Sequence, residues 1–292
     1  MRELVPAGGG LLWDRESLRE DDWLVRLPSH EAGVSGRAGR DALADVAACV
    51  DRRLREGPGF AVVRGLDLDG LGDAECLELS RWFGGLLGTV RAYREATDEL
   101  VTAEARAGGR APVPEQDRDD RALPPHMDRS PQREPPRVLG LLCVRPALSG
   151  GESILVSGAA VHNRLLVEHP SLLRHLYEKV HFGRGEGFER FFPVFRRRPG
   201  GSGTSDALEV CYNRHHIERG QREAGVPLPT GYLAALEAFD GVLADRRMAL
   251  RFPLRRGDFL LVANKAVLHG RTAFTDPREP VLQRFLVRMW AD

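Results

Sequence analysis

Apolar residues follow two different periods along the chain. Between residues 41 and 57, Leu43, Val46, Ala47, Val50 and Leu54 recur at the 3.6-residue spacing that puts them on one face of a helix. The same spacing predicts helices at 73–86 and 230–244. Residues 158–177 also look helical, and Pro170 divides them into two pieces. These segments account for most of the predicted helix.

The second pattern is that of strands, and it dominates after residue 137. Short apolar runs predict buried strands, and the alternation of apolar and polar residues at 248–255 is the period of two of a half-buried strand. The predicted strands cover residues 59–66, 138–144, 152–156, 207–213, 248–255, 258–264, 266–270 and 281–290. Many short strands with few crossover helices favour an α+β protein with a mainly β core, a sandwich or barrel flanked by helices. No natural boundary divides the sequence, so we expect residues 1–292 to form one domain.

Residues 97–125 interrupt both patterns with glycine, proline and clusters of charge. A loop of this length without structure of its own is uncommon inside a domain, and is usually either functional or disordered. It leads directly into the candidate metal ligands described below. We therefore expect either a lid over a site or a disordered segment.

Composition narrows the classes of partner. Lys+Arg and Asp+Glu are both 42, so the net charge is zero, and a general nucleic-acid or anionic-membrane binder would need a basic surplus. The four cysteines form no C-x-x-C pair, which favours reduced thiols over a zinc site or disulfide frame. No signal peptide or run of 18 apolar residues is present, so we expect a cytoplasmic protein. The oligomeric state stays open.

The sequence LPPHMDRSP, residues 123–131, contains the first candidate metal ligands. Its two prolines keep the chain extended as it enters His126. In an extended chain, residues i and i+2 project to the same side, so His126 and Asp128 point together and can share one ion. An H-x-D pair alone is weak evidence, because most such pairs are surface or core residues.

A third ligand is available in NKAVLHGRTAF, residues 264–274, where His269 lies at a predicted strand end. Two histidines and one carboxylate form the facial triad of non-haem iron oxygenases, which leaves positions open for a 2-oxo acid and O₂. Alternatively, His269 is a hydrogen-bonded core histidine. The same donor set would also suit the zinc of a hydrolase.

Two arginines on the last predicted strand fit the 2-oxo acid. Arg284 and Arg288 are four residues apart, so they share one face with Leu286 and Trp290. Arginine is the preferred partner for a carboxylate, and two arginines in so apolar a strand need partners. The alternative is a pair of edge arginines whose side chains reach water.

The chain resembles the taurine dioxygenase and clavaminate synthase-like branch of Fe(II)/2-oxoglutarate oxygenases, roughly from residue 59 to the end. The resemblance rests on an ordered series of segments: HMD (126–128), CVRPALSGGES (143–153), YNRHHIERGQREAG (212–225), RRGDFLLVANKAVLHGRTAF (255–274) and QRFLVR (283–288). It implies a double-stranded β-helix, or jelly roll. It also implies Fe(II), 2-oxoglutarate and O₂ as cofactor and co-substrates.

Individual positions take roles from this resemblance. His126, Asp128 and His269 match the iron ligands, while Ser153 and Arg284 match residues that bind 2-oxoglutarate. Halogenating relatives have glycine or alanine in place of the carboxylate, so Asp128 favours hydroxylation or a related oxidation. Amino-acid hydroxylases of the clavaminate-like branch usually carry glutamate there, which leaves the substrate class open.

The expected substrate is a small molecule such as an amino acid or a specialised-metabolite intermediate, free or tethered to a carrier protein. Candidate substrate-binding residues are Arg288, Arg271 and Arg214. No separate protein acid or base is assigned, because the metal centre carries the chemistry. Two other classes stay open: a catalytically silent jelly-roll binding protein, and a zinc-dependent hydrolase with the same three ligands.

The remaining histidines are expected to be structural. His215 and His216 are adjacent, and on a strand they would point to opposite faces, with at most one facing a pocket. His162 and His169 lie on or near a predicted helix, and we expect them on its surface.

Overall fold

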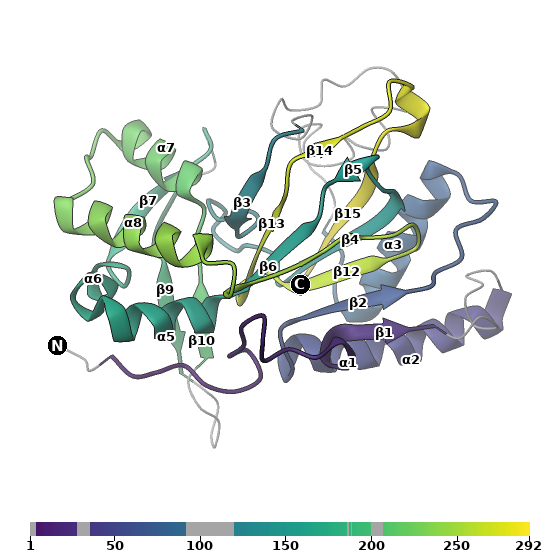
Figure 1. Cartoon of the computed structure of the whole chain (residues 1–292), viewed down its shortest axis with the longest axis horizontal. Coiled ribbons are helices and arrows are strands. Elements are labelled where there is room, and N and C mark those ends of the chain that lie inside the picture. The colour runs from purple at the N-terminus through teal and green to yellow at the C-terminus, as the bar shows by residue number, and fades with distance from the viewer. Residues whose placement is uncertain (1–3, 28–35, 92–119, 186, 188, 200–206) are drawn as a thin grey trace.

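Two β-sheets form the centre of the protein in the computed structural model, which describes residues 4–27, 36–91, 120–185, 187, 189–199 and 207–292 (Figure 1). The first sheet has the strand order β1-β2-β12-β4-β15, and the second has β11-β6-β13-β3. The strands of the first sheet are β1 (Leu24–Arg26), β2 (Phe60–Arg64), β12 (Phe259–Ala263), β4 (Val138–Arg145) and β15 (Phe285–Ala291). Those of the second are β11 (Ala249–Phe252), β6 (Ser153–Ser157), β13 (Val267–Arg271) and β3 (Leu123–His126).

The inner faces of the two sheets pack against each other. Leu260 and Val262 of β12 meet Leu155 of β6 and Val267 of β13 in one buried cluster, which also contains Trp290 of β15. Because side chains alternate across a strand, residues two apart from these point into the same interior. His269 and Arg271 on β13, and Arg288 on β15, therefore face the space between the sheets. The apolar cluster fills one part of that space, and these polar residues occupy another.

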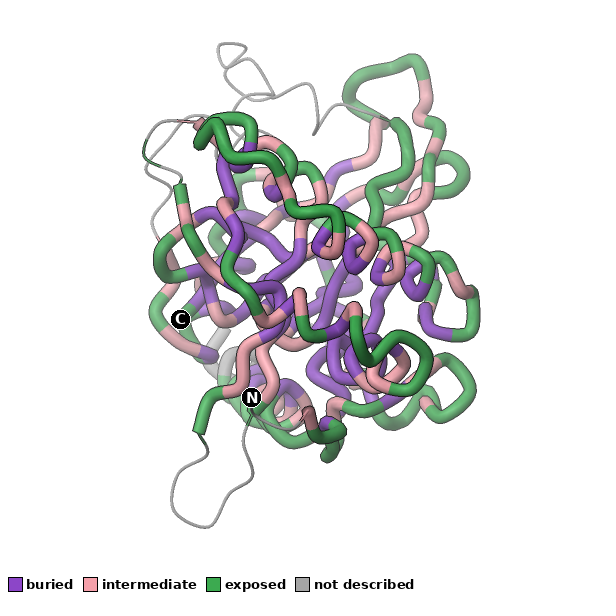
Figure 2. Tube along the Cα trace, turned by 90° about the vertical axis from the view of Figure 1, so that its left-hand side faces the viewer, coloured by how far each residue is buried: buried purple, intermediate pink, exposed green. Residues whose placement is uncertain are grey.

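Two helices cover the outer face of the first sheet. Apolar residues of α2 (Gly36–Arg55) and α3 (Asp73–Leu87) pack on Phe259 and Leu261 of β12 and on Val287 of β15. Figure 1 shows α2 along the lower edge of this sheet and α3 behind β4. The apolar stripe of residues 43–54 is thus explained by burial against the sheet, and Figure 2 shows the buried residues concentrated inside the exposed outer turns.

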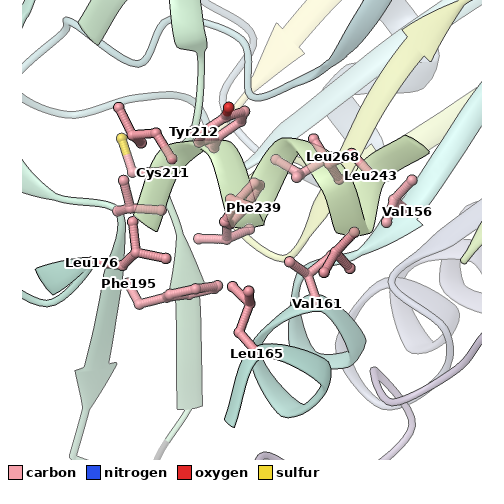
Figure 3. Packing of buried hydrophobic residues seen from close by; sticks show 14 of the residues in the cluster. Val156, Val161, Leu165, Leu176, Phe195, Cys211, Tyr212, Phe239, Leu243 and Leu268 are labelled. Atoms are coloured by element: carbon pink, nitrogen blue, oxygen red, sulfur yellow. The ribbon is translucent and has the colours of Figure 1, made fainter. Parts of the chain in front are cut away.

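Four further helices cover the outer face of the second sheet. Phe239 of α8 (Thr230–Ala244) packs with Leu165 of α5 (Gly158–Glu168) and with Val156 and Leu268 of the sheet (Figure 3). Phe195 and Tyr212 complete this cluster. The layer also contains α6 (Pro170–His175), α7 (Arg214–Ala224) and the hairpins β7 (Lys179–Gly183) with β8 (Glu189–Pro193) and β9 (Phe195–Arg198) with β10 (Ala207–Val210).

The remaining elements are small. They are α1 (Glu20–Trp23), the pair β5 (Ser149–Gly150) with β14 (Phe274–Thr275), and a 3-10 turn at Pro280–Leu282. Among the described residues, no helix is both long and apolar enough to cross a bilayer.

The predicted helices and strands are confirmed, with boundaries shifted by a few residues. Two predictions about histidines are wrong. His215 and His216 lie at the start of helix α7 and not on a strand. His162 is fully buried and accepts a hydrogen bond from the Tyr177 hydroxyl, whereas it was expected on a helix surface. The predicted lid at 97–125 lies mostly in residues 92–119, outside the described residues, and stays a prediction.

A buried ion pair ties β2 to the turn before β12. The Arg64 guanidinium donates to both carboxylate oxygens of Asp258, at 2.9 and 2.8 Å, and Asp258 is 1% exposed. Arg64→Ala should lower the free energy of unfolding by about 3 kcal/mol, because it leaves a buried carboxylate uncompensated. Arg26→Ala is the control: Arg26 is the register neighbour of Arg64 but forms only an exposed pair with Glu20. Urea unfolding measures both, and equal losses would contradict the assignment.

Candidate active site

The pairing of β13 with β3 brings two histidines together. His269 lies directly opposite His126 in the register of these antiparallel strands, so both side chains project from the same face. Their ring centroids are 4.5 Å apart. Two residues that are 143 positions apart in the sequence are therefore neighbours because of strand register alone.

Asp128 follows the end of β3, and its backbone is held in place by one side chain. The Asn264 amide accepts a hydrogen bond from the Asp128 N–H at 3.0 Å and donates to the Asp128 carbonyl at 3.1 Å. Asn264 directly follows β12 in the sequence and is fully buried. With its backbone held in this way, Asp128 has its carboxylate oxygen Oδ1 at 3.3 Å from Nε2 of both His126 and His269.

These three side chains form the group that could hold a metal ion. Their ligand atoms all lie within 4.8 Å of one another. Nδ1 of His126 donates to the carbonyl oxygen of Pro124 at 2.9 Å, and since a carbonyl only accepts, the lone pair of this ring belongs to Nε2. That is the nitrogen facing Asp128. Such an outer hydrogen bond is the usual way in which a ligand histidine is oriented.

Burial and charge set the protonation states of the group. Burial pushes the pKa of Asp128 upward, but the charge of Arg288 and the interactions with the two neighbouring histidines outweigh it, so the pKa lies well below its usual range. Burial and the neighbouring His126 lower the pKa of His269. An ionised carboxylate beside a neutral imidazole is the state in which these groups bind a metal.

The donor set fits Fe(II). Two imidazoles and one carboxylate are the ligands of non-haem iron sites that keep open positions, and imidazole is a suitable ligand for iron. The nearby cation, the Arg288 guanidinium, lies 3.7 Å from Oδ2 of Asp128, and the other oxygen, Oδ1, faces the two imidazoles.

A second group of polar side chains, which includes two arginines, lies near Ser153 of β6 and Phe274 of β14. Ser153 of β6 lies opposite Arg271 of β13 in the register, and is 6% exposed. The guanidinium carbons of Arg271 and Arg284 lie 4.6 and 5.2 Å from the ring centroid of Phe274. Burial and the charge of Arg271 lower the pKa of Arg284 to about 10, so it stays protonated at neutral pH. Two cations and a hydroxyl therefore surround one small region.

A cavity of about 240 Å³ adjoins this region and is lined by Arg284, Leu286, Cys143, Gly151 and Leu254, among others. Gly151 has a φ of +70°, and an added Cβ would lie 3.4 Å from Nε of Arg284. A glycine is needed here both for the backbone conformation and for the close approach of the arginine.

The structure separates the three candidate substrate-binding arginines. Arg288 faces Asp128, and Arg271 lies beside Arg284 as described above. Arg214 is the first residue of α7 in the helical layer, where it donates to Asp240 at 2.8 Å and to Glu218 at 2.7 Å. Its charge is thus already compensated by two carboxylates.

Three residues near the metal ligands were not identified from the sequence. They are Asn264, which holds the Asp128 backbone; Trp290, whose indole N–H donates to Asp128 Oδ2 at 3.1 Å; and His216, which lies 2.8 Å from the Ser130 hydroxyl. Burial and the charge of His126 lower the pKa of His216 to about 3. Trp290 shares a strand face with Arg288, and that alternation is a signal that could have indicated its position.

A family model and two curated proteins match this chain in sequence. The model is described as taurine catabolism dioxygenase TauD, TfdA family, and it matches residues 29–290. FR-33289 synthase of Streptomyces rubellomurinus is 29% identical over 250 residues, which cover 84% of this chain and 72% of that protein. A taurine hydroxylase-like protein of Stachybotrys chartarum is 26% identical over 172 residues, covering 57% of this chain and 41% of that protein.

Solved structures show the same fold. An asparagine oxygenase with Fe(II), 3-hydroxyasparagine and succinate superposes with a TM-score of 0.65 at 20% identity, covering 92% of this chain and 93% of that one. The non-haem iron oxygenase OrfP with Fe and α-ketoglutaric acid gives a TM-score of 0.61 at 15% identity, with the same coverage. These similarities confirm the predicted double-stranded β-helix with a mainly β core.

Proposed function

Because the chain belongs to the taurine catabolism dioxygenase TauD, TfdA family, we propose that it is an Fe(II)- and 2-oxoglutarate-dependent dioxygenase that hydroxylates a small molecule, with release of succinate and CO₂. The observation that supports this most strongly is the convergence of His126 and Asp128, at the end of β3, with His269 of β13. The neighbouring arginines Arg271 and Arg284, with Ser153, support the keto acid.

Each residue has a role in this proposal. His126, Asp128 and His269 hold the iron, while Arg284 and Ser153 bind the distal carboxylate of 2-oxoglutarate. Bound there, iron and 2-oxoglutarate supply the O₂ chemistry in which one oxygen atom enters the substrate and the other enters succinate. The protein orients both and limits the access of water, because the apolar inner faces of the two sheets pack together beside the site.

The substrate that we propose is an amino acid or a specialised-metabolite intermediate. The solved relatives support an amino acid, because one was determined with 3-hydroxyasparagine and another with L-Arg. FR-33289 synthase supports a specialised metabolite. Arg288 and Arg271 are the candidates that we propose for binding an anionic group on such a molecule, and a carrier-tethered substrate stays within the proposal.

The test is a succinate-release screen with purified protein, Fe(II), 2-oxoglutarate and O₂, over free amino acids, sulfonates and carrier-bound acyl groups. The expected result is succinate formation that depends on substrate, with a product 16 Da heavier by mass spectrometry. Turnover without O₂ or 2-oxoglutarate would instead indicate a zinc hydrolase. A 2-oxoglutarate–Fe(II) absorption band without any turnover would indicate a binding protein.

A further inference from the structure

The two carboxylate oxygens of Asp128 face different groups. Oδ1 lies 3.3 Å from Nε2 of His126 and of His269. Oδ2 accepts a hydrogen bond from Nε1 of Trp290 at 3.1 Å and lies 3.7 Å from the guanidinium of Arg288. Asp128 is 7% exposed and Trp290 is 3% exposed, so water has little access to this hydrogen bond. One oxygen is therefore directed to the imidazoles, and the other is held by a different strand.

Trp290 is itself held by the residue that follows Asp128. Arg129 is the one described non-glycine residue with a positive φ, +59°, a conformation that only a few per cent of such residues adopt. It is 6% exposed, and its guanidinium carbon lies 4.3 Å from the centroid of the Trp290 ring. Two consecutive residues thus contact one indole: Asp128 accepts a hydrogen bond from its N–H, and Arg129 packs on the face of its ring.

The position of Trp290 on its strand explains why it reaches the carboxylate. It lies opposite Leu139 of β4 in the register and belongs to the cluster between the sheets. Since β15 is at the edge of the first sheet and β3 is at the edge of the second, the indole connects the two sheets at the metal ligands. A phenyl ring could fill most of the same volume but could not donate a hydrogen bond.

We propose that Trp290 is a positioning residue, which holds Oδ2 so that Asp128 offers Oδ1 alone to the metal, and that Arg129 keeps the indole in place. This rests on the proposed function. A carboxylate that binds through one oxygen leaves three of six positions for the two keto-acid oxygens and O₂. If Oδ2 were released, it would compete for one of them.

The test compares two identical substitutions in the same core. Trp290→Phe removes the N–H that faces Asp128. Trp13→Phe is the matched control, because Trp13 is 4% exposed and belongs to the same apolar cluster. Its N–H donates to the backbone carbonyl of Pro58 at 2.7 Å and not to a candidate ligand. Titration of each purified protein with Co(II), followed by visible absorption, gives a dissociation constant without turnover.

Trp290→Phe should weaken Co(II) binding about 10- to 100-fold, the usual effect of removing an outer partner of a ligand. Its Co(II) band should also change on addition of 2-oxoglutarate less than that of the wild type. Trp13→Phe should bind like the wild type. Equal affinity of Trp290→Phe and wild type overturns the inference, as does an equal loss in both variants, which would mark an effect of packing.

Arg129→Asn supplies a second variant, which leaves the indole N–H of Trp290 in place and removes the guanidinium that packs on its ring. Asparagine accepts a positive φ more readily than most residues, so it removes the guanidinium with little backbone strain. Loss of the stacking contact should weaken Co(II) binding about fivefold, and unchanged affinity overturns the inference even where Trp290→Phe does not fold. Wild-type protein without any Co(II) binding would overturn the proposed metal site together with this inference, whereas the results above overturn the inference alone.

Discussion

Asp128→Ala is expected to abolish 2-oxoglutarate-coupled succinate formation and to leave the fold intact. The substitution removes the only carboxylate among the three described side chains that can share a metal ion. Losing an outer partner of a ligand costs 10- to 100-fold, so loss of a ligand itself should reduce turnover by at least about 1,000-fold. The fold should persist because Asn264 binds the Asp128 backbone and not its carboxylate.

His269→Ala should give the same result, since it removes a ligand from the partner strand. His169→Ala is the control, because His169 is exposed at the junction of α5 and α6 in the helical layer. Succinate is measured by mass spectrometry, and circular dichroism checks the fold. Full turnover in Asp128→Ala or His269→Ala would show that the residue is not a ligand.

The sequence was sufficient to predict that the three candidate ligands lie together, because two simple rules apply to them. Residues 126 and 128 project together from an extended chain, and a third ligand at a strand end can meet them if the strands pair. The register of β13 and β3 does pair them, with His269 opposite His126. The alternation along β15 likewise separated Leu286 and Trp290 of the interior from Phe285, Val287 and Met289 under α3.

Helix α7 was missed because it lacks an apolar stripe of the expected kind. Most of its residues are polar, and only Ile217, Gly220 and Gln221 are buried. Its signals are at the ends: the Asn213 side chain accepts from the His216 N–H at the start, and Gly225 ends the helix with a φ of +66°. Such capping residues are common in loops as well, so they identify a helix only with the structure in hand.

Apart from the meeting of the three candidate ligands, side-chain contacts between distant segments could not be predicted. The burial of His162 depends on Tyr177, in the turn after α6, and on Phe195 of β9, which reach it only after the helical layer has packed. The hydrogen bond from Trp290 to Asp128 joins edge strands of two sheets, 162 residues apart. Periodicity identifies the face on which a residue lies, but it does not identify the side chain that lies opposite.

Arg284→Ala is expected to weaken 2-oxoglutarate binding about 100-fold while leaving iron binding unchanged. An arginine–carboxylate pair usually forms two charge-assisted hydrogen bonds, each contributing about 1.5–3 kcal/mol, and every 1.4 kcal/mol is about tenfold in the dissociation constant. Arg284 is well suited to this because it lies beside Arg271, where a bound anion reduces the repulsion between two cations. Its pKa of about 10 keeps it charged, so the effect should be constant between pH 6 and 8.

The presence of Arg271 beside Arg284 also predicts how KM and kcat should respond. If Arg271 shares the distal carboxylate, Arg284→Ala should raise the KM for 2-oxoglutarate and lower kcat little at saturation, because one cation still holds the co-substrate. Arg251→Ala is the control, since Arg251 is exposed on β11 of the sheet that carries Ser153. Steady-state kinetics and anaerobic titration of the Fe(II)–2-oxoglutarate band measure both quantities. An unchanged KM would remove Arg284 from the co-substrate site, and would leave Arg271 and Ser153 as the residues that bind it.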